Sequence, residues 1–218
     1  LTGNKCLVDT FDRNFQFNVE HVSLAKLADI FLVAPASADV IGKIANGIAD
    51  DMLTTTIMAC KCPKLISPAM NTNMFTNPIV QDNLKKLEHY GYEIIQPDSG
   101  YLACGDTGAG KMPSEQVLLN YILRTIAKDK DMAGIKLTVT AGPTREKLDP
   151  VRFLSNNSTG KMGYAIARMA MLRGADVTLI SGKVSLEPVP FVKMVDIVSA
   201  EDMYNAVIKN AKDADIII

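Results

Sequence analysis

The sequence predicts an α/β protein with mostly parallel sheets, and three observations support this fold class. Short apolar runs bounded by turn residues have the character of strands. They alternate with longer segments in which apolar residues recur at the period of a helix. This alternation continues through all 218 residues, a length that exceeds one domain of about 150 residues. We therefore expect one α/β domain followed by part of a second.

The first half of the chain is expected to contain three strands and three helices. The predicted strands are Ile30–Ala34, Lys64–Ser67 and Glu93–Gln96. The predicted helices are Val40–Ala59, Pro78–Tyr90 and Ser114–Ala127. Asn77 is suited to cap the second helix, and Pro78 is suited to its first position.

A polar segment, Lys128–Gly134, is the predicted domain boundary because linkers between domains are polar and exposed. The expected domains are residues 1–130 and 135–218. The second domain is expected to contain the strands Lys136–Thr140, Asp176–Ile180, Lys193–Val198 and Asp215–Ile218. Its predicted helices are Thr159–Arg173 and Ala200–Ala211. This repeated strand–helix–strand order is typical of the start of a Rossmann-like domain.

The composition is that of an ordinary globular protein with a net charge of −1. This charge gives no indication of a nucleic-acid partner, and no apolar run approaches the roughly 18 residues that span a membrane. We expect a cytoplasmic protein with small-molecule substrates and with neither nucleic acid nor membrane as a partner. The chain starts at Leu1 and ends on the apolar run Ile216–Ile218, so we expect both ends to be cuts through folded structure.

Two Gly-Lys segments must be tested as phosphate-binding Walker loops. Residues 105–111 have the required spacing, but Met112 stands where a magnesium-binding Ser or Thr is needed. In Ser158–Gly163 the lysine is also followed by Met, and Ser155 occupies the place of the upstream glycine. Neither segment is a Walker loop. Ser158–Gly163 remains either an anion-binding helix start or a helix start packed for structural reasons.

Several motifs in the first part of the chain resemble the flavin-containing cysteine decarboxylases. These motifs are Leu1–Asn4, His21–Asp29, Ala34–Asp39, Gly47–Thr55, Pro68–Phe75 and Gly100–Asp106. The later motifs are similar to phosphopantothenate–cysteine ligases, and they are Thr140–Glu146, Asp149–Arg152 and Ser155–Gly163. Their order is that of the fused bacterial enzyme family of coenzyme A biosynthesis, and the resemblance covers essentially the whole chain. It implies a Rossmann-like flavoprotein domain followed by the start of a Rossmann-like ligase domain.

The resemblance also implies two activities and their cofactors. The first is FMN-dependent decarboxylation of 4'-phosphopantothenoylcysteine to 4'-phosphopantetheine. The second is ligation of 4'-phosphopantothenate with cysteine, which uses CTP together with Mg²⁺. A homo-oligomer is expected because flavin sites in this family form between subunits. The flavin-phosphate loop is expected before Leu1, and the residues that hold the cytidine base are expected after Ile218.

The resemblance assigns catalytic roles to three residues of the first half. His21 corresponds to the catalytic histidine, and Asn71 to the residue that binds the cysteinyl carboxylate. Met74 is implied to cover the substrate, next to Phe75 where the family commonly has Trp. Cys104 resembles the proton donor on a glycine-rich flap. Taken singly, a histidine, an Asn-rich turn or a thiol at such positions also has an ordinary structural explanation.

The loop Pro35–Asp39 lies against the flavin in this family, so the implied FMN contacts are Ser37, Ala38 and Asp39. The family usually has Asn-Thr where this chain has Asp39 and Val40. A carboxylate only accepts hydrogen bonds, whereas an amide can also donate them. This departure changes what position 39 can offer to the flavin.

In the second half, the resemblance implies a CTP site and one further catalytic residue. The implied CTP contacts are Gly142, Pro143, Thr144, Ser158, Gly160 and Lys161. Asn156 is implied to take part in the conversion of the acyl-cytidylate intermediate. No residue is assigned to a metal ion.

Two other functional classes were weighed against this interpretation. The family also contains non-catalytic members that bind and restrain a phosphatase, but a binding module has no chemical need for His21, Asn71 and Cys104 together. A nicotinamide-dependent dehydrogenase requires G-x-G-x-x-G after a strand. The segment that follows Lys136–Thr140 is Ala-Gly-Pro-Thr instead, which excludes the dehydrogenase.

Overall fold

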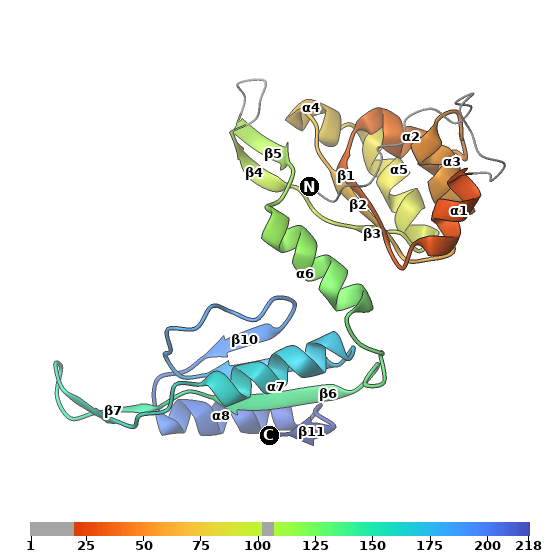
Figure 1. The fold of residues 1–218 in the computed structure, drawn as a ribbon. Coiled ribbons are helices and arrows are strands. Elements are labelled where there is room, and N and C mark those ends of the chain that lie inside the picture. Colours follow the sequence, from red (N-terminus) through yellow and green to blue (C-terminus); the bar gives the residue numbers. More distant parts are fainter. Residues whose placement is uncertain (1–19, 102–106) are drawn as a thin grey trace. The chain divides into compact units, whose positions relative to one another are not determined.

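The computed structural model describes residues 20–101 and 107–218. The chain divides into two compact units, residues 1–121 and 122–218. The division falls inside helix α6 (Glu115–Ile126), earlier than the segment 128–134 in which the sequence places the boundary. Each unit has its own parallel sheet and its own buried core (Figure 1).

The first unit contains a three-stranded parallel sheet in the order β1-β2-β3. Its strands are β1 (Phe31–Ala36), β2 (Lys64–Pro68) and β3 (Glu93–Ile94). Its helices before α6 are α1 (Glu20–Leu27), α2 (Ala38–Ala45), α3 (Met52–Ala59), α4 (Thr72–Phe75) and α5 (Pro78–His89). An antiparallel hairpin consists of β4 (Asp98–Tyr101) and β5 (Thr107–Lys111).

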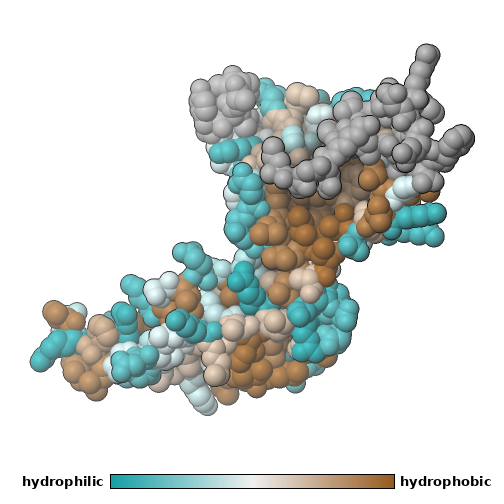
Figure 2. All heavy atoms as spheres, viewed as in Figure 1, coloured by the Kyte–Doolittle hydropathy of each residue, from teal (hydrophilic) through white to brown (hydrophobic). Residues whose placement is uncertain are grey.

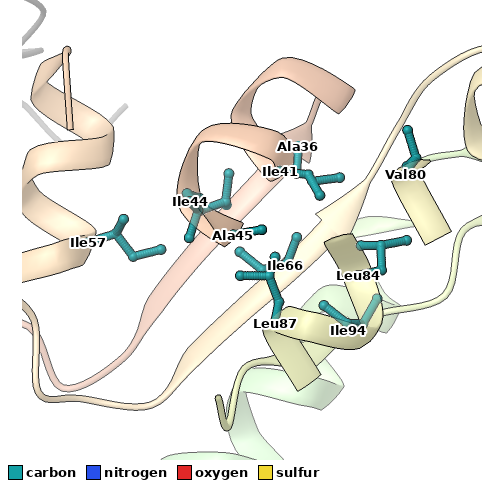
Figure 3. Packing of buried hydrophobic residues seen from close by; sticks show 11 residues of the cluster. Ala36, Ile41, Ile44, Ala45, Ile57, Ile66, Val80, Leu84, Leu87 and Ile94 are labelled. Atoms are coloured by element: carbon teal, nitrogen blue, oxygen red, sulfur yellow. The ribbon is translucent and has the colours of Figure 1, made fainter. Parts of the chain in front are cut away.

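The core of the first unit lies where α2 and α5 pack on the sheet. Ile41 and Ile44 of α2 and Leu84 and Leu87 of α5 gather around Ile66 of β2 (Figure 3). All five side chains are at most 6% exposed. Burying each such side chain contributes about 1.5–3 kcal/mol. This layer therefore holds the carboxyl ends of β1 and β2 in place, next to the loop expected to contact a cofactor.

The sequence predicts a single helix over Val40–Ala59, and this prediction is wrong. Gly47 has φ = +71°, a left-handed conformation that interrupts an α-helix. Asp51 then starts α3 with a capping box: its carboxylate accepts a hydrogen bond from Thr54 N at 2.7 Å, and Thr54 Oγ1 accepts one from Asp51 N at 3.2 Å. The pattern of apolar residues does not reveal this break, because apolar residues continue on both sides of it.

The second unit contains a four-stranded parallel sheet in the order β10-β9-β6-β11. Its strands are β6 (Lys136–Ala141), β9 (Asp176–Ser181), β10 (Lys193–Asp196) and β11 (Ile216–Ile217). Its helices are α7 (Lys161–Leu172) and α8 (Ala200–Ala211), and a short hairpin consists of β7 (Arg145–Lys147) and β8 (Phe153–Ser155). The predicted α/β Rossmann-like fold class is confirmed. The two hairpins and the helices α1 and α4 were not among the elements expected from the sequence pattern.

Both units expose apolar side chains, which appear brown in Figure 2. Leu27 in the first unit is 78% exposed, and Val151 in the second is 86% exposed. Within the described part of the chain, no helix is long and apolar enough to cross a membrane.

Candidate functional site

A groove of about 590 Å³ lies in the first unit between α2 and the segment that contains α4 and the start of α5. Ala38 and Asp39 line this groove, and so does Met74. The structure thus brings two predicted cofactor contacts together with a predicted substrate contact. Ser37 is not part of the lining. Its hydroxyl accepts a hydrogen bond from Val40 N at 3.3 Å and caps α2.

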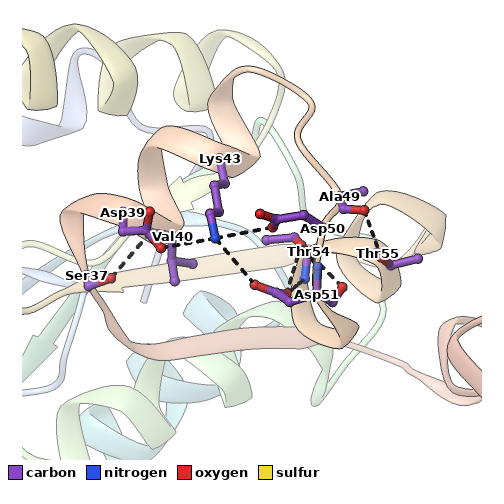
Figure 4. Close-up of polar contacts among 9 residues, drawn as sticks. All are labelled: Ser37, Asp39, Val40, Lys43, Ala49, Asp50, Asp51, Thr54 and Thr55. Atoms are coloured by element: carbon purple, nitrogen blue, oxygen red, sulfur yellow. Dashed lines mark hydrogen bonds and ion pairs between the residues drawn. The ribbon is translucent and has the colours of Figure 1, made fainter. Parts of the chain in front are cut away.

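Lys43 forms ion pairs that link Asp39 to other charged residues at this groove (Figure 4). Its Nζ lies 3.3 Å from a carboxylate oxygen of Asp39, 3.2 Å from one of Asp50 and 3.9 Å from one of Asp51. The hydrogen bonds that Lys43 donates to Asp50 and to Asp39, in that order of effect, raise the pKa of Lys43. The lysine therefore remains charged and keeps the Asp39 carboxylate directed along its own helix.

Asp51 combines this ion pair with its role as a helix cap. The pKa of Asp51 is lowered, chiefly by the hydrogen bond from the backbone of Thr54. The carboxylate thus stays ionised at neutral pH, where it can both cap α3 and attract Lys43.

Asn71 lies at the start of α4, where its Oδ1 accepts a hydrogen bond from Asn73 N at 2.8 Å. The preceding residue, Met70, donates its backbone N–H to Gly110 O at 3.0 Å, so β5 lies directly against the predicted substrate segment. Gly110 has φ = +136°, and a Cβ at this position would overlap the Met70 carbonyl. The base of the β4–β5 hairpin is therefore fixed beside Asn71. Cys104 lies outside the described residues.

His21 lies in the first turn of α1 and is half-buried. Figure 1 shows α1 and α4 on opposite sides of the first unit. Within one chain, the structure therefore does not bring His21 to Asn71 and Met74. Phe75 packs against the hydrophobic core of the unit.

A second cavity, of about 330 Å³, lies in the second unit at the carboxyl end of β6. Four of the predicted CTP contacts line it: Gly142, Ser158, Gly160 and Lys161. The other two do not. Pro143 is buried, and the Thr144 carbonyl accepts a hydrogen bond from Ser155 Oγ at 2.8 Å.

The start of α7 forms one wall of this second cavity. Its N-cap is Gly160, which has φ = +75° and offers no side chain to cap the helix. Gly163, in the first turn, packs so closely on β6 that a Cβ would lie 2.6 Å from the Ala141 Cβ. Asn156 is outside the lining, and its Oδ1 accepts a hydrogen bond from Ser158 N at 2.9 Å. Asn156 thus shapes the turn that leads into α7.

With this geometry established, the family of the chain follows from comparison with known proteins. The family model described as "Flavoprotein" matches residues 1–127. The chain belongs to the flavoprotein family. A second model, "DNA/pantothenate metabolism flavoprotein C-terminal domain", matches residues 132–218.

Relatives of this flavoprotein match it over its whole length. "Coenzyme A biosynthesis bifunctional protein CoaBC" of Bacillus subtilis is 44% identical over 221 residues, which cover 100% of this chain and 54% of that protein. The protein of the same name from Vibrio vulnificus is 46% identical over 218 residues, with the same coverage. A solved structure of a PPC decarboxylase complexed with pantothenoylaminoethenethiol is 35% identical, with a TM-score of 0.48, and the match covers 52% of this chain and 63% of that one. The flavoprotein spans about half the length of the curated relatives it matches.

The groove in this flavoprotein has a lining of mixed chemical character, which is compatible with a flavin. Ala38 and Met74 supply apolar surface, and Asn46 and Asn77 add amide groups, which is the mixture typical of small-molecule sites. The Asp39 carboxylate, held by Lys43, offers an acceptor at the rim. Among the described residues, no group of three His, Cys, Asp or Glu side chains could hold a metal ion.

The sequence interpretation missed Lys43 as a member of this site. The available signal was the spacing of Asp39 and Lys43, since residues four apart on a helix form ion pairs. The approach of Asp50 depends on the break between α2 and α3, which the sequence interpretation did not predict.

Proposed function

We propose that the first unit of this flavoprotein binds FMN and decarboxylates 4'-phosphopantothenoylcysteine in coenzyme A biosynthesis. One observation carries this proposal: the groove in which Ala38 and Asp39 lie beside Met74. The motif resemblance assigns the first two residues to the flavin and the third to the substrate. The coenzyme A biosynthesis proteins that match the whole chain support the same pathway.

Bound FMN would supply the oxidation of the substrate thiol that makes loss of carbon dioxide possible. The chain itself orients the substrate and handles protons. Asn71 binds the cysteinyl carboxylate, and Met74 covers the substrate and excludes water. His21 serves proton transfer during the oxidation, and Cys104 returns a proton to the product.

We further propose that the complete site forms between copies of the chain in a homo-oligomer. Helix α1, which contains His21, and helix α4, which Asn71 caps, lie on opposite sides of one unit (Figure 1), so both residues can act on one substrate only if another copy supplies one of them. Gel filtration with flavin absorbance tests this point in protein extended to the full length of the curated relatives. A monomer that retains tightly bound FMN would contradict it.

Two substitutions separate the proposed catalytic steps. Cys104→Ser should still release carbon dioxide but fail to return the reduced product, whereas His21→Asn should block the oxidation itself. The measurement is the product mass after a single turnover of the extended protein. Equal loss of both steps in both variants would show that these roles are wrong. A parent protein that binds FMN but turns over no substrate would favour the non-catalytic, protein-binding alternative.

For the second unit, we propose a part in the CTP-dependent ligation of 4'-phosphopantothenate with cysteine. The observation that favours it is the uncapped start of α7, which lines the second cavity beside Lys161. Free backbone N–H groups at a helix start favour an anion such as a phosphate. Mg²⁺ would enter together with the triphosphate.

Two further substitutions test this ligase proposal. In the extended protein, Asn156→Asp should still release pyrophosphate but transfer the acyl group to cysteine about 10²–10³ times more slowly, since a preorganised donor is lost. Lys161→Ala should instead weaken CTP binding. Abolition of pyrophosphate release by Asn156→Asp would place Asn156 in activation or folding instead.

A further inference from the structure

Two cysteines lie two positions apart in the connection between α3 and β2 of the first unit. Cys60 ends α3, where its backbone N–H bonds to Thr56 O at 3.1 Å. Cys62 follows after one exposed residue, Lys61, and both cysteines are free thiols. Neither residue lines the groove or the second cavity, so no part of the proposed function uses them.

The two thiols belong to residues separated by a single position, but their surroundings differ. The side chains are close enough for Cys62 to influence the pKa of Cys60. Cys60 is only 6% exposed, whereas Cys62 is half-buried. Burial, followed by the proximity of Cys62, raises the pKa of Cys60. Cys62 is therefore the cysteine that a dissolved reagent reaches more readily, and Cys60 is the buried member of the pair.

A cation also lies within this cluster. Lys64 Nζ donates a hydrogen bond to the Cys62 carbonyl at 3.3 Å, and it lies 5.4 Å from the centre of the Tyr92 ring. The charge of Lys64 acts to lower the pKa of Cys60, against the effect of burial. A nearby cation favours the thiolate form, which is the reactive species in thiol–disulfide exchange.

We propose that Cys60 and Cys62 form a reversible intramolecular disulfide when the protein meets a small disulfide oxidant such as oxidised glutathione. The Cys62 thiolate attacks one sulfur of the oxidant and releases one glutathione thiolate, which takes up a proton. Cys60 then loses its proton and attacks the Cys62 sulfur of the mixed disulfide, releasing the second glutathione. The two protein thiols are oxidised by two electrons, and the oxidant is reduced to two thiols.

A metal site is the other use of adjacent thiols, and the structure favours the disulfide. A structural zinc ion requires four ligands. In the regions that the structure describes, no three His, Cys, Asp or Glu side chains gather to supply them. A disulfide across a single intervening residue closes a very small ring, and such constrained bonds are readily reduced. This makes the proposed oxidation reversible.

Tryptic mapping of the whole chain tests the proposal, because trypsin cuts after Lys61, between the two cysteines. The chain is treated with oxidised glutathione, alkylated and digested without reductant. We expect peptide 44–61 to remain joined to peptide 62–64 and to separate when dithiothreitol is added. An uncut peptide 44–64 that has lost two hydrogen atoms counts as the same result.

Single substitutions provide matched controls for the order of the two steps. Cys60→Ser should accumulate glutathione on Cys62, because the second sulfur is missing. Cys62→Ser should react far more slowly, since only the buried thiol remains. The proposal is overturned if the unsubstituted chain keeps glutathione on Cys62, if both thiols remain alkylatable, or if Cys60 is found joined to Cys6 or Cys104.

Discussion

The helix starts at the two candidate sites are built in opposite ways. In the first unit, Ser37 caps α2 with its side chain, and Asp39 in the first turn pairs with Lys43. In the second unit, Gly160 precedes α7 without any side-chain cap, and the first turn packs on β6 through Gly163. Both helix starts lie near the carboxyl ends of parallel strands, where ligands bind in open α/β sheets.

This difference determines which groups each site can offer to a ligand. At α2, Ser37 already uses a first-turn N–H group, so recognition in the groove falls to side chains such as Asp39 and Met74. At α7, the cap residue Gly160 has no side chain to occupy the first-turn amides, so the backbone itself can meet an anion. The same class of sheet thus presents side chains at one candidate site and backbone amides at the other.

The largest expected loss of stability comes from a substitution that disrupts the close packing between α7 and β6. Gly163→Ala would place a Cβ 2.6 Å from the Ala141 Cβ and 2.8 Å from Thr140 O. We expect destabilisation by about 1–3 kcal/mol because overpacking shifts the helix from the strand. The matched control is Gly42→Ala in α2, where the nearest atom would be Asn83 Nδ2 at 3.8 Å.

Gly42→Ala should be neutral or stabilise by up to about 1 kcal/mol, since alanine favours helix more than glycine. Urea denaturation of both variants measures the two effects. Equal stability changes in the two helices would mean that α7 does not depend on close contact with β6.

A second prediction concerns how the stability contributed by a helix cap depends on pH. Asp51→Ala removes the carboxylate that caps α3, so we expect a loss of about 1–2 kcal/mol at neutral pH. The pKa of Asp51 is lowered in the folded chain, so the carboxylate contributes fully above its unfolded pKa of about 3.9. This contribution disappears as the pH falls through the lower folded value.

Urea unfolding of the parent and of Asp51→Ala at a series of pH values measures this dependence. Asp202→Ala in α8 is a positive control, because hydrogen bonds from Ser199 also lower the pKa of Asp202. The stability that Asp202 contributes should therefore also be lost as the pH falls. A stability difference for Asp51→Ala that stays constant down to the most acidic pH would show that the cap does not act through its charge.

The smallest expected stability changes come from replacing two buried serines near the ends of central strands. Ser67 in β2 is 0% exposed, and its hydroxyl has no hydrogen-bond partner among the described residues. Ser181 in β9 is 2% exposed, and its hydroxyl accepts from Tyr164 Oη at 3.1 Å and donates to Gly182 O at 2.8 Å.

Ser67→Ala should therefore be neutral or stabilise by up to about 1 kcal/mol, because an unpaired hydroxyl is removed from the core. Ser181→Ala should destabilise by about 1 kcal/mol, since it leaves Tyr164 and the Gly182 carbonyl without this partner. Thermal melting of the two variants provides the comparison. Clear destabilisation by Ser67→Ala would indicate that the hydroxyl has a partner in the folded protein.

The sequence by itself determined the alternation of strands and helices. The strand Asp176–Ile180 and the helix Ala200–Ala211 agree with β9 and α8 to within one residue. These elements follow from local apolar runs and from caps such as Ser199, whose signals lie within a few neighbouring residues. The residue types of the candidate sites were also visible, because motifs are local in the chain.

Only the tertiary structure decided how those residues meet. The distance from Lys43 to Asp50 depends on the break at Gly47, and the place of Asn71 depends on β5, which bonds to Met70 across 40 positions. The same holds for Ser67 and Ser181, which are both buried. The Ser67 hydroxyl has no hydrogen-bond partner among the described residues, whereas the Ser181 hydroxyl accepts a hydrogen bond from Tyr164. Such contacts join residues that are distant in the chain, and their energies depend on packing and geometry that no local pattern encodes.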